Sequence, residues 1–208
     1  MKDRFGGLFC LEYVYLDGMT DFPKNYQIAV EAAIAASHVI MEIYGTDFEA
    51  ELKPDDSPVT NADIASSEII NRILQATEMP ITSEEDEKHS YEIRKNWSES
   101  WCIDPLDGTK EFIKRNGEFA VNIAHIVGNR AEFGVIASPT QEKVLFGGKK
   151  TGIYFCSFHD FHHTTKWNKL EPKPLNKPLV MTASRSHHSD PILEIIHELQ
   201  EKYGSVEF

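Results

Sequence analysis

The stretch Asp104-Pro105-Leu106-Asp107-Gly108-Thr109 places two carboxylates three positions apart, with a glycine and a hydroxyl residue directly after the second. Apolar and aromatic residues lead into it and out of it, which predicts a buried strand, a tight turn and then a helix. Pro105 has a fixed φ and no N–H group to satisfy, and Gly108 lets the backbone approach a ligand closely. Asp104 and Asp107 can therefore converge at the end of the strand. Carboxylates beside the N–H groups of a helix start can hold divalent cations and a phosphate ester together.

Asp and Gly are also common turn residues, so this stretch alone could be an ordinary turn. Two other acidic segments favour a binding site. Ser83-Glu84-Glu85-Asp86 follows a short apolar run, Met79-Pro80-Ile81, that predicts a strand. Residues 55–63 precede a helical pattern and end in Asp63. Three acidic loops, each at the edge of a predicted element, are the components of a site for several metal ions and a phosphate.

The composition is ordinary for a globular protein, with 208 residues of which 41% are hydrophobic and 26% are charged. This length suffices for one domain or two small lobes. The net charge of -12 argues against a general nucleic-acid binder, which needs a basic surface. No apolar run approaches the length of a membrane span, and the first residues lack the apolar middle of a signal peptide.

The chain has three cysteines, Cys10, Cys102 and Cys156, which form no Cys-x-x-Cys pair. A disulfide framework or zinc knuckle is therefore not expected, and a reducing cytoplasm is the expected compartment. Three neighbouring histidines lack matched cysteine or acidic partners, so a zinc site is not favoured at His159, His162 and His163.

Hydrophobic periodicity predicts helices over residues 26–44, 62–75 and 191–203, and strands over 48–53, 119–127, 131–138, 143–146 and 179–183. Gly45 is expected to end the first helix, and Thr60 or Asn61 to cap the second. Residues 86–98 should form an exposed loop or short helix, and residues 157–178 an exposed excursion. The second helix is expected to face the core with Ile64, Ile69, Ile73 and Leu74.

Four segments carry a resemblance to a known family. They are Pro58-Val59-Thr60-Asn61-Ala62-Asp63, Ser83-Glu84-Glu85-Asp86, the run from Asp104 to Phe119, and Ala183-Ser184-Arg185-Ser186-His187-His188. In this order and spacing they resemble the inositol monophosphatase superfamily of Mg²⁺-dependent, lithium-sensitive phosphatases. The Lys-Glu-Phe that follows Thr109 favours the bacterial 3′(2′),5′-bisphosphate nucleotidase branch (the CysQ type).

The resemblance implies a cofactor of two or three Mg²⁺ ions. Their ligands would be the carboxylates of Glu84, Asp104 and Asp107 and the carbonyl oxygen of Leu106. Asp104 would bridge two ions, Glu84 would serve the first, and Asp107 the second. These oxygen donors suit Mg²⁺. Glu85 would point away from its neighbour in an extended segment, and is expected behind the ligands or in solvent.

The resemblance also implies a catalytic pair, Asp63 and Thr109, that takes the proton of the attacking water. The backbone amides of Gly108 and Thr109 would bind the phosphate at the helix start. Asp63 could instead be only a first-turn acid that complements the helix dipole.

Substrate contacts are implied farther along the chain. Ser184, Ser186 and His187 would touch the nucleotide or its second phosphate, or would only cap a helix or lie in a loop. Three cations could either attract an anionic substrate or be ordinary surface charge: Lys110, Lys114 and Arg115.

The implied fold class is layered α/β (α+β), the inositol monophosphatase-like sugar-phosphatase fold with layered helices and a largely antiparallel sheet. The expected regions are an extension over residues 1–23, an N-terminal metal-binding lobe over 24–178, and the start of an incomplete C-terminal α/β lobe over 179–208. The family's Trp-Asp-x-Ala-type motif, whose aspartate completes one metal site, has no counterpart here, since Asn168 follows Trp167.

Three functions remain open. The first is removal of the 3′-phosphate of adenosine 3′,5′-bisphosphate, a by-product of sulfate assimilation. The second is hydrolysis of an inositol or other sugar phosphate with the same metals. The third is a truncated, inactive metal-binding remnant, for which exposed apolar surface predicts poor solubility or a homodimer. The expected partner in the first two cases is a small-molecule phosphate ester.

Overall fold

The computed structural model describes residues 22–48, 50–52, 58–86, 89–174, 179–180, 190–204 and 206–207. The chain divides into two compact units, Met1–Leu170 and Glu171–Phe208. The extension expected over residues 1–23 lies outside the described residues except for Phe22 and Pro23. The region boundaries expected from the sequence stay a prediction.

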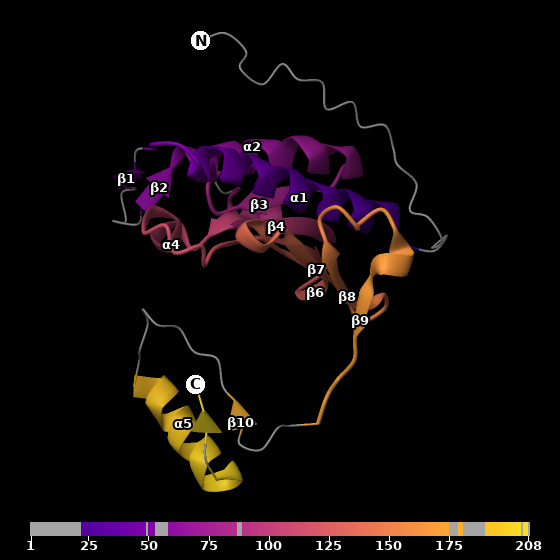
Figure 1. Ribbon diagram of the computed structural model, residues 1–208. Coiled ribbons are helices and arrows are strands. Elements are labelled where there is room, and N and C mark those ends of the chain that lie inside the picture. The colour runs from indigo at the N-terminus through magenta and orange to yellow at the C-terminus, as the bar shows by residue number, and fades with distance from the viewer. Residues whose placement is uncertain are drawn as a thin grey trace. The chain divides into compact units, whose positions relative to one another are not determined.

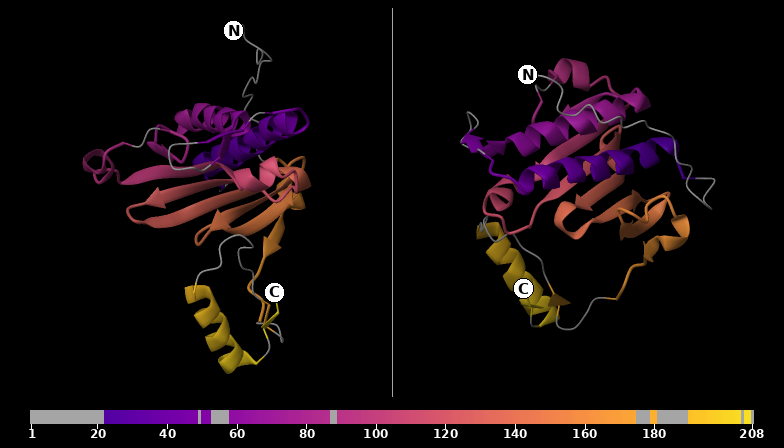
Figure 2. Two further views of the ribbon diagram at one scale, coloured as in Figure 1. Left: turned by 90° about the vertical axis from the view of Figure 1, so that its left-hand side faces the viewer. Right: turned by 45° about the horizontal axis from the view of Figure 1, so that its top comes forward.

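The larger unit is built on a seven-stranded sheet in the order β3-β4-β5-β6-β7-β8-β9, with helices α1 and α2 across one face (Figure 1; Figure 2). β3 is parallel to β4, and the other neighbouring strands are antiparallel. Layered helices on a largely antiparallel sheet confirm the expected fold class. The strands are β3 (Ile81–Ser83), β4 (Glu99–Asp107), β5 (Ala120–Val127), β6 (Arg130–Ser138), β7 (Lys143–Gly148), β8 (Gly152–Ser157) and β9 (Asn168–Leu170).

The remaining elements of this unit lie largely where the pattern places them. The long helix α1 (Lys24–Tyr44) ends at Gly45, and Thr60 is the N-cap of α2 (Asn61–Leu74), as expected. The strand expected over residues 48–53 is found at β1 (Ala50–Leu52), which pairs with β2 (Pro58–Thr60). The short elements are α3 (Tyr91–Arg94), α4 (Thr109–Ile113), η1 (Gln75–Thr77), η2 (Pro139–Gln141) and η3 (Thr164–Lys166).

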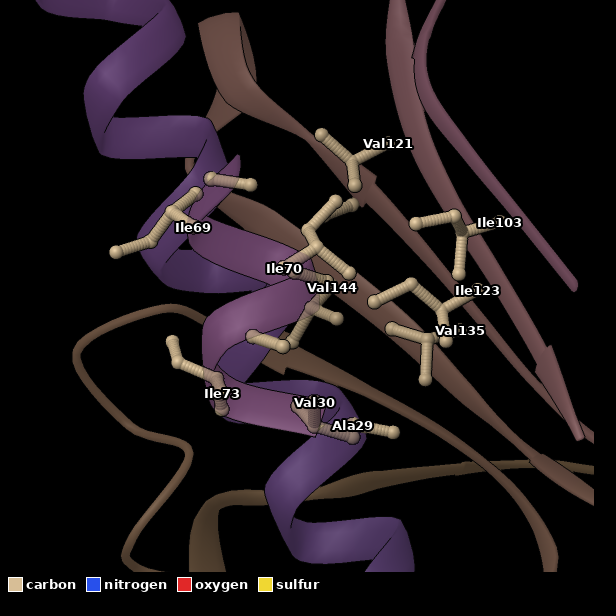
Figure 3. Close-up of a cluster of buried hydrophobic side chains, with 14 of the residues drawn as sticks. Ala29, Val30, Ile69, Ile70, Ile73, Ile103, Val121, Ile123, Val135 and Val144 are labelled. Carbon is tan, nitrogen blue, oxygen red and sulfur yellow. The ribbon is translucent and has the colours of Figure 1, made fainter. Parts of the chain in front are cut away.

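The core lies between the two long helices and the inner face of the sheet. Every second residue of the strands points to this face, because side chains alternate along a strand. Figure 3 shows Ile103, Val121 and Ile123 of the sheet close to Ile70 of α2. The side of α1 that enters the core is made mostly of fully buried small residues, which let the helix approach its neighbours closely: Ala29, Ala32, Ala33 and Ala36.

The burial predicted for one residue of α2 is wrong. Ile69, Ile73 and Leu74 are buried as expected, but Ile64 is 52% exposed. Nine residues separate Ile64 from Ile73, which is about two and a half helical turns, so the two side chains lie on opposite sides of the helix.

The exposed excursion expected over residues 157–178 is also wrong in its first half. Phe158 and Phe161 are buried, and the Trp167 indole stacks on Phe161 and donates to its carbonyl oxygen at 2.8 Å. Strand β9 follows directly and extends the sheet. The aromatic residues in this segment outweigh its many polar residues, because each buries a large apolar area.

The smaller unit contains α5 (Asp190–Tyr203) between two short parallel strands, β10 (Leu179–Val180) and β11 (Val206–Glu207). The predicted helix over residues 191–203 is confirmed, and it ends at Gly204, whose φ is 89°. The strand expected over 179–183 is found at its first two residues, and the other three lie outside the described residues. In the described part of the chain, no helix is both long and apolar enough to cross a membrane.

Candidate metal and phosphate site

The acidic segments that begin at Glu84 and at Asp104 lie side by side, because each follows one of two neighbouring parallel strands. Ser83 at the end of β3 pairs with Ile103 of β4. The Glu84 N–H group then donates to the Ile103 carbonyl oxygen at 3.3 Å. Glu84 and Asp104 therefore each follow one member of the last β3–β4 residue pair.

A bulge in β4 shapes the second acidic segment. Asp104 pairs with Asn122 of β5 and Asp107 with Ala120, so three steps along β4 match two steps along β5. In a regular strand, residues three apart point to opposite faces, and the extra residue of a bulge removes this opposition. The Asn122 amide, in register with Asp104, donates to Oδ2 of Asp107 at 2.9 Å.

Asn122 is thus a site residue that the motif search missed. Its neighbours Val121 and Ile123 are buried in the core, so strand alternation directs Asn122 to the opposite face. One signal could have identified it. Asn122 is a polar residue at an outward position of β5, the strand that pairs with the acidic motif of β4.

The electrostatics of Asp104 show that acidic groups gather here. Burial raises its pKa to about 7, and the negative charges of Glu84, Asp107 and Glu85 add to the effect, while a backbone hydrogen bond at Leu106 opposes it. Charge concentrated in this way is costly without a cation. A bound cation would therefore reduce the repulsion among these carboxylates.

Asp63 and Thr109 lie together, as the resemblance implies. The Thr109 hydroxyl donates to Oδ1 of Asp63 at 2.9 Å and lies 3.3 Å from the Leu106 carbonyl oxygen. Oδ2 of the fully buried Asp63 accepts from the backbone N–H and the hydroxyl of Thr60, at 2.8 and 2.7 Å, in a capping box. The helix-start role and the contact with Thr109 thus use different oxygens of one carboxylate.

Gly108 is required by the backbone at the start of α4. Its φ is 94°, and a Cβ atom there would lie 2.9 Å from the Glu118 carbonyl oxygen. Any side chain would therefore shift the turn that joins the acidic motif to α4.

The donor set fits Mg²⁺ by its chemistry. Among the residues that the structure describes, no three His, Cys, Asp or Glu side chains form a ready-made metal cage. Mg²⁺ does not need one, because it keeps several waters and takes one or two carboxylates together with substrate phosphate. Glu84, Asp104, Asp107 and the Leu106 carbonyl supply hard oxygen donors only.

Arg115 is exposed and makes contacts that neither of the two roles expected for it describes. Its guanidinium donates to the carbonyl oxygens of Tyr44 and Thr46, at 2.5 and 2.6 Å, and lies 4.9 Å from the Phe48 ring centroid. It therefore holds the end of α1 through bonds and stacking. Lys110 and Lys114 are exposed, and Lys114 lies 3.8 Å from Glu111.

The remaining expected substrate contacts, Ser184, Ser186 and His187, lie outside the described residues.

Comparison with known proteins agrees with this geometry. The 3′(2′),5′-bisphosphate nucleotidase CysQ of Salmonella typhimurium is 37% identical over 171 residues, which are 80% of this chain and 65% of that protein. CysQ of Escherichia coli K12 has the same identity and coverage. The crystal structure of CysQ from Bacteroides thetaiotaomicron, titled a bacterial member of the inositol monophosphatase family, matches with a TM-score of 0.76 at 36% identity. That match covers 90% of this chain and 72% of the other.

The chain spans 65% of the length of these two curated relatives. The model of the inositol monophosphatase family matches residues 23–205, which include all three acidic segments. The resemblance stated from the motifs is confirmed, and the chain belongs to the inositol monophosphatase family.

Proposed function

We propose that this chain carries the active site of an Mg²⁺-dependent phosphatase that removes the 3′-phosphate of adenosine 3′,5′-bisphosphate. The observation that carries the proposal is the meeting of Glu84 with Asp104 and Asp107 at the ends of β3 and β4. The Asp63–Thr109 hydrogen bond joins α2 to the same acidic motif. The choice of substrate is supported by the nucleotidase relatives at 37% identity.

Glu84, Asp104, Asp107 and the Leu106 carbonyl would hold two or three Mg²⁺ ions. Bound Mg²⁺ lowers the pKa of a water molecule and offsets charge on the phosphoryl oxygens. Asn122 keeps one oxygen of Asp107 engaged at 2.9 Å, so the carboxylate presents the other oxygen in a fixed direction.

The Asp63–Thr109 pair would receive the proton of the attacking water. The Thr109 hydroxyl gives its own hydrogen to Oδ1 of Asp63, which leaves an oxygen lone pair to accept from water. Thr60 fixes the other oxygen of Asp63, so the carboxylate cannot rotate away from Thr109. Geometry of this kind is the requirement for general base catalysis.

The turn at Gly108 would orient the phosphate. The positive φ of Gly108 turns the chain into α4, and the backbone amides of Gly108 and Thr109 at this helix start would bind a phosphate oxygen. Charge that develops on the phosphate in the transition state would be stabilised by these fixed donors.

The organic part of the substrate would be bound by Ser184, Ser186 and His187 and by groups beyond this site. The cytoplasmic location and the homodimer expected from the sequence stay predictions. A second candidate function is hydrolysis of an inositol or sugar monophosphate, since the family model that matches is that of inositol monophosphatase.

A comparison of substrates tests the choice between the two. Phosphate release would be measured with adenosine 3′,5′-bisphosphate and with inositol 1-phosphate at equal concentration and saturating Mg²⁺. The nucleotidase proposal requires a higher kcat/KM for the bisphosphate. A higher kcat/KM for the inositol ester would favour the second function over the nucleotidase proposal. The proposed metal site would stand in either case.

A further inference from the structure

Helix α2 carries a polar edge formed by Ser67 and Asn71, which bond to the exposed Asp86. Ser67 is 3% exposed and lies one turn before Asn71, and both face the segment that follows β3. Figure 1 places α2 over β3 and β4. Ser67 is buried and Asn71 half-buried, and a buried hydroxyl is costly without a partner, so the contacts of these two residues define what this edge does.

Both carboxylate oxygens of Asp86 are bound from this helix. The Asn71 amide donates to Oδ2 at 2.7 Å, and the Ser67 hydroxyl donates to Oδ1 at 3.2 Å. Asn71 also donates to the Ser67 oxygen at 3.2 Å, which aligns the two donors with each other. The Ser83 hydroxyl lies 3.3 Å from that oxygen and joins the network.

The network closes a short turn around Glu84. At its start, the Glu84 N–H group is bonded to Ile103 of β4. The Glu85 N–H group donates to the Ser83 hydroxyl at 3.2 Å, and Asp86 then anchors the turn on α2. Glu84 is thus held from both sides, by β4 before it and by α2 after it.

The donors that hold Asp86 are a neutral amide and a neutral hydroxyl, which is consistent with a position beside a metal site. Asp86 follows two glutamates, and a lysine or arginine partner would compete with a metal ion for the same negative charge. An amide and a hydroxyl fix the carboxylate by hydrogen bonds and leave the charge of the site available.

We infer that Asn71, Ser67 and Asp86 are positioning residues that set the place of Glu84 and, through it, the affinity of the chain for divalent cations. This inference rests on the proposed metal site. Groups that orient metal ligands are commonly worth a factor of about 10 to 100 in metal affinity.

An exchange of the two partners tests the inference. N71D puts a carboxylate against Asp86 and removes the donor. The double variant N71D/D86N restores a donor–acceptor pair with the roles reversed and keeps the net charge of the wild type. The amide oxygen at position 86 can still accept from Ser67, so the swap keeps both contacts to position 86 and loses only the bond from residue 71 to the Ser67 oxygen.

Two measurements on the purified chain test the variants without relying on enzymatic activity. Mn²⁺ alone is titrated and the free ion is followed by electron paramagnetic resonance. Hydrogen exchange of residues 81–86 is measured without metal. We expect N71D to weaken Mn²⁺ binding about tenfold and to speed exchange at Glu84, and the double variant to return within about threefold of wild-type affinity.

The control is E68Q, which changes an exposed carboxylate on the outer side of α2 and should leave both readouts unchanged. Wild-type Mn²⁺ affinity in N71D, or no recovery in the double variant, would overturn the positioning role even if nucleotide hydrolysis is found. Weakened and then rescued Mn²⁺ binding in a chain that hydrolyses no bisphosphate would support the positioning role and remove the nucleotidase proposal. A wild-type chain that binds no Mn²⁺ would overturn both.

Discussion

The Thr109 hydroxyl donates a 2.9 Å hydrogen bond to Oδ1 of Asp63, although 46 positions separate the two residues in the chain. The second oxygen of Asp63 holds Thr60 at the start of α2. One buried carboxylate therefore fixes a helix start with one oxygen and a candidate catalytic hydroxyl with the other. Loss of this contact should affect catalysis more than folding.

Thr109→Val keeps the shape of the side chain and removes its hydroxyl. We expect kcat to fall by about 10² to 10⁴, the range that general base assistance typically contributes. Asp63→Asn should cost a similar factor, and the double variant little more, since the two residues act as one unit. Initial rates at saturating Mg²⁺ measure all three. Single effects that multiply in the double variant would contradict a shared role.

Asp107→Asn should leave the fold intact, because the amide oxygen can still accept from Asn122. The loss of a charged ligand should lower kcat/KM by about a hundredfold or more and raise the Mg²⁺ concentration needed for half-maximal rate. Circular dichroism and phosphate release measure the two effects, with E68Q as the charge-matched control. A wild-type rate in Asp107→Asn would refute its role as a ligand.

Asp104 should make the metal-free chain less stable at high pH. Its carboxyl pKa rises from 3.8 to about 7 on folding. Its contribution to stability is therefore present below about pH 4 and is lost as the pH rises through 7. Asp104→Asn removes the buried charge, so at pH 8 in EDTA the variant should unfold about 2 to 5 °C above the wild type.

At pH 5 the Asp104 carboxyl is protonated in the folded wild type but largely ionised in the unfolded chain, so the difference in unfolding temperature should be about a third of that at pH 8. Thermal scans at both pH values measure the difference. Mg²⁺ at pH 8 should stabilise the wild type and have less effect on the variant. An equal difference at pH 5 and pH 8 would show that the effect does not come from this titration.

Arg115→Ala should lower the free energy of unfolding by about 1 to 2 kcal/mol, because the carbonyl oxygens of Tyr44 and Thr46 lose a charged donor. Arg115→Lys should rescue little, since one ammonium cannot reproduce the planar fork and its stacking. Mn²⁺ affinity should stay unchanged in both. Urea denaturation measures the loss, and Lys114→Ala at the exposed neighbour is the control. A raised KM for the bisphosphate with unchanged stability would instead support attraction of the anionic substrate by Arg115.

The sequence identified the acidic residues because each set lies in one short segment at the end of an element. Asp104 and Asp107 could be paired from spacing alone, although only the bulge against Asn122 and Ala120 explains how residues three apart act together. The role of Asn122 depends on strand register, which the local pattern does not state.

Contacts between distant segments could not be predicted either, because they also depend on packing that the local pattern does not state. The bonds from Asn71 to Asp86 and from Arg115 to the end of α1 join elements whose packing is set by the whole core. Strand β9 was missed because polar residues surround the few aromatic side chains that anchor it. Periodicity identifies elements well where one face is continuously apolar, and less well in such mixed segments.

We propose that the acidic residues at the ends of β3 and β4 form an Mg²⁺-dependent phosphatase site. The most direct test is phosphate release from adenosine 3′,5′-bisphosphate by the 208-residue chain as Mg²⁺ is raised from zero, with and without lithium. We expect no release in EDTA, release that saturates with Mg²⁺, and suppression by lithium. A folded chain that releases no phosphate at any Mg²⁺ concentration, or that releases it equally in EDTA, would contradict the claim.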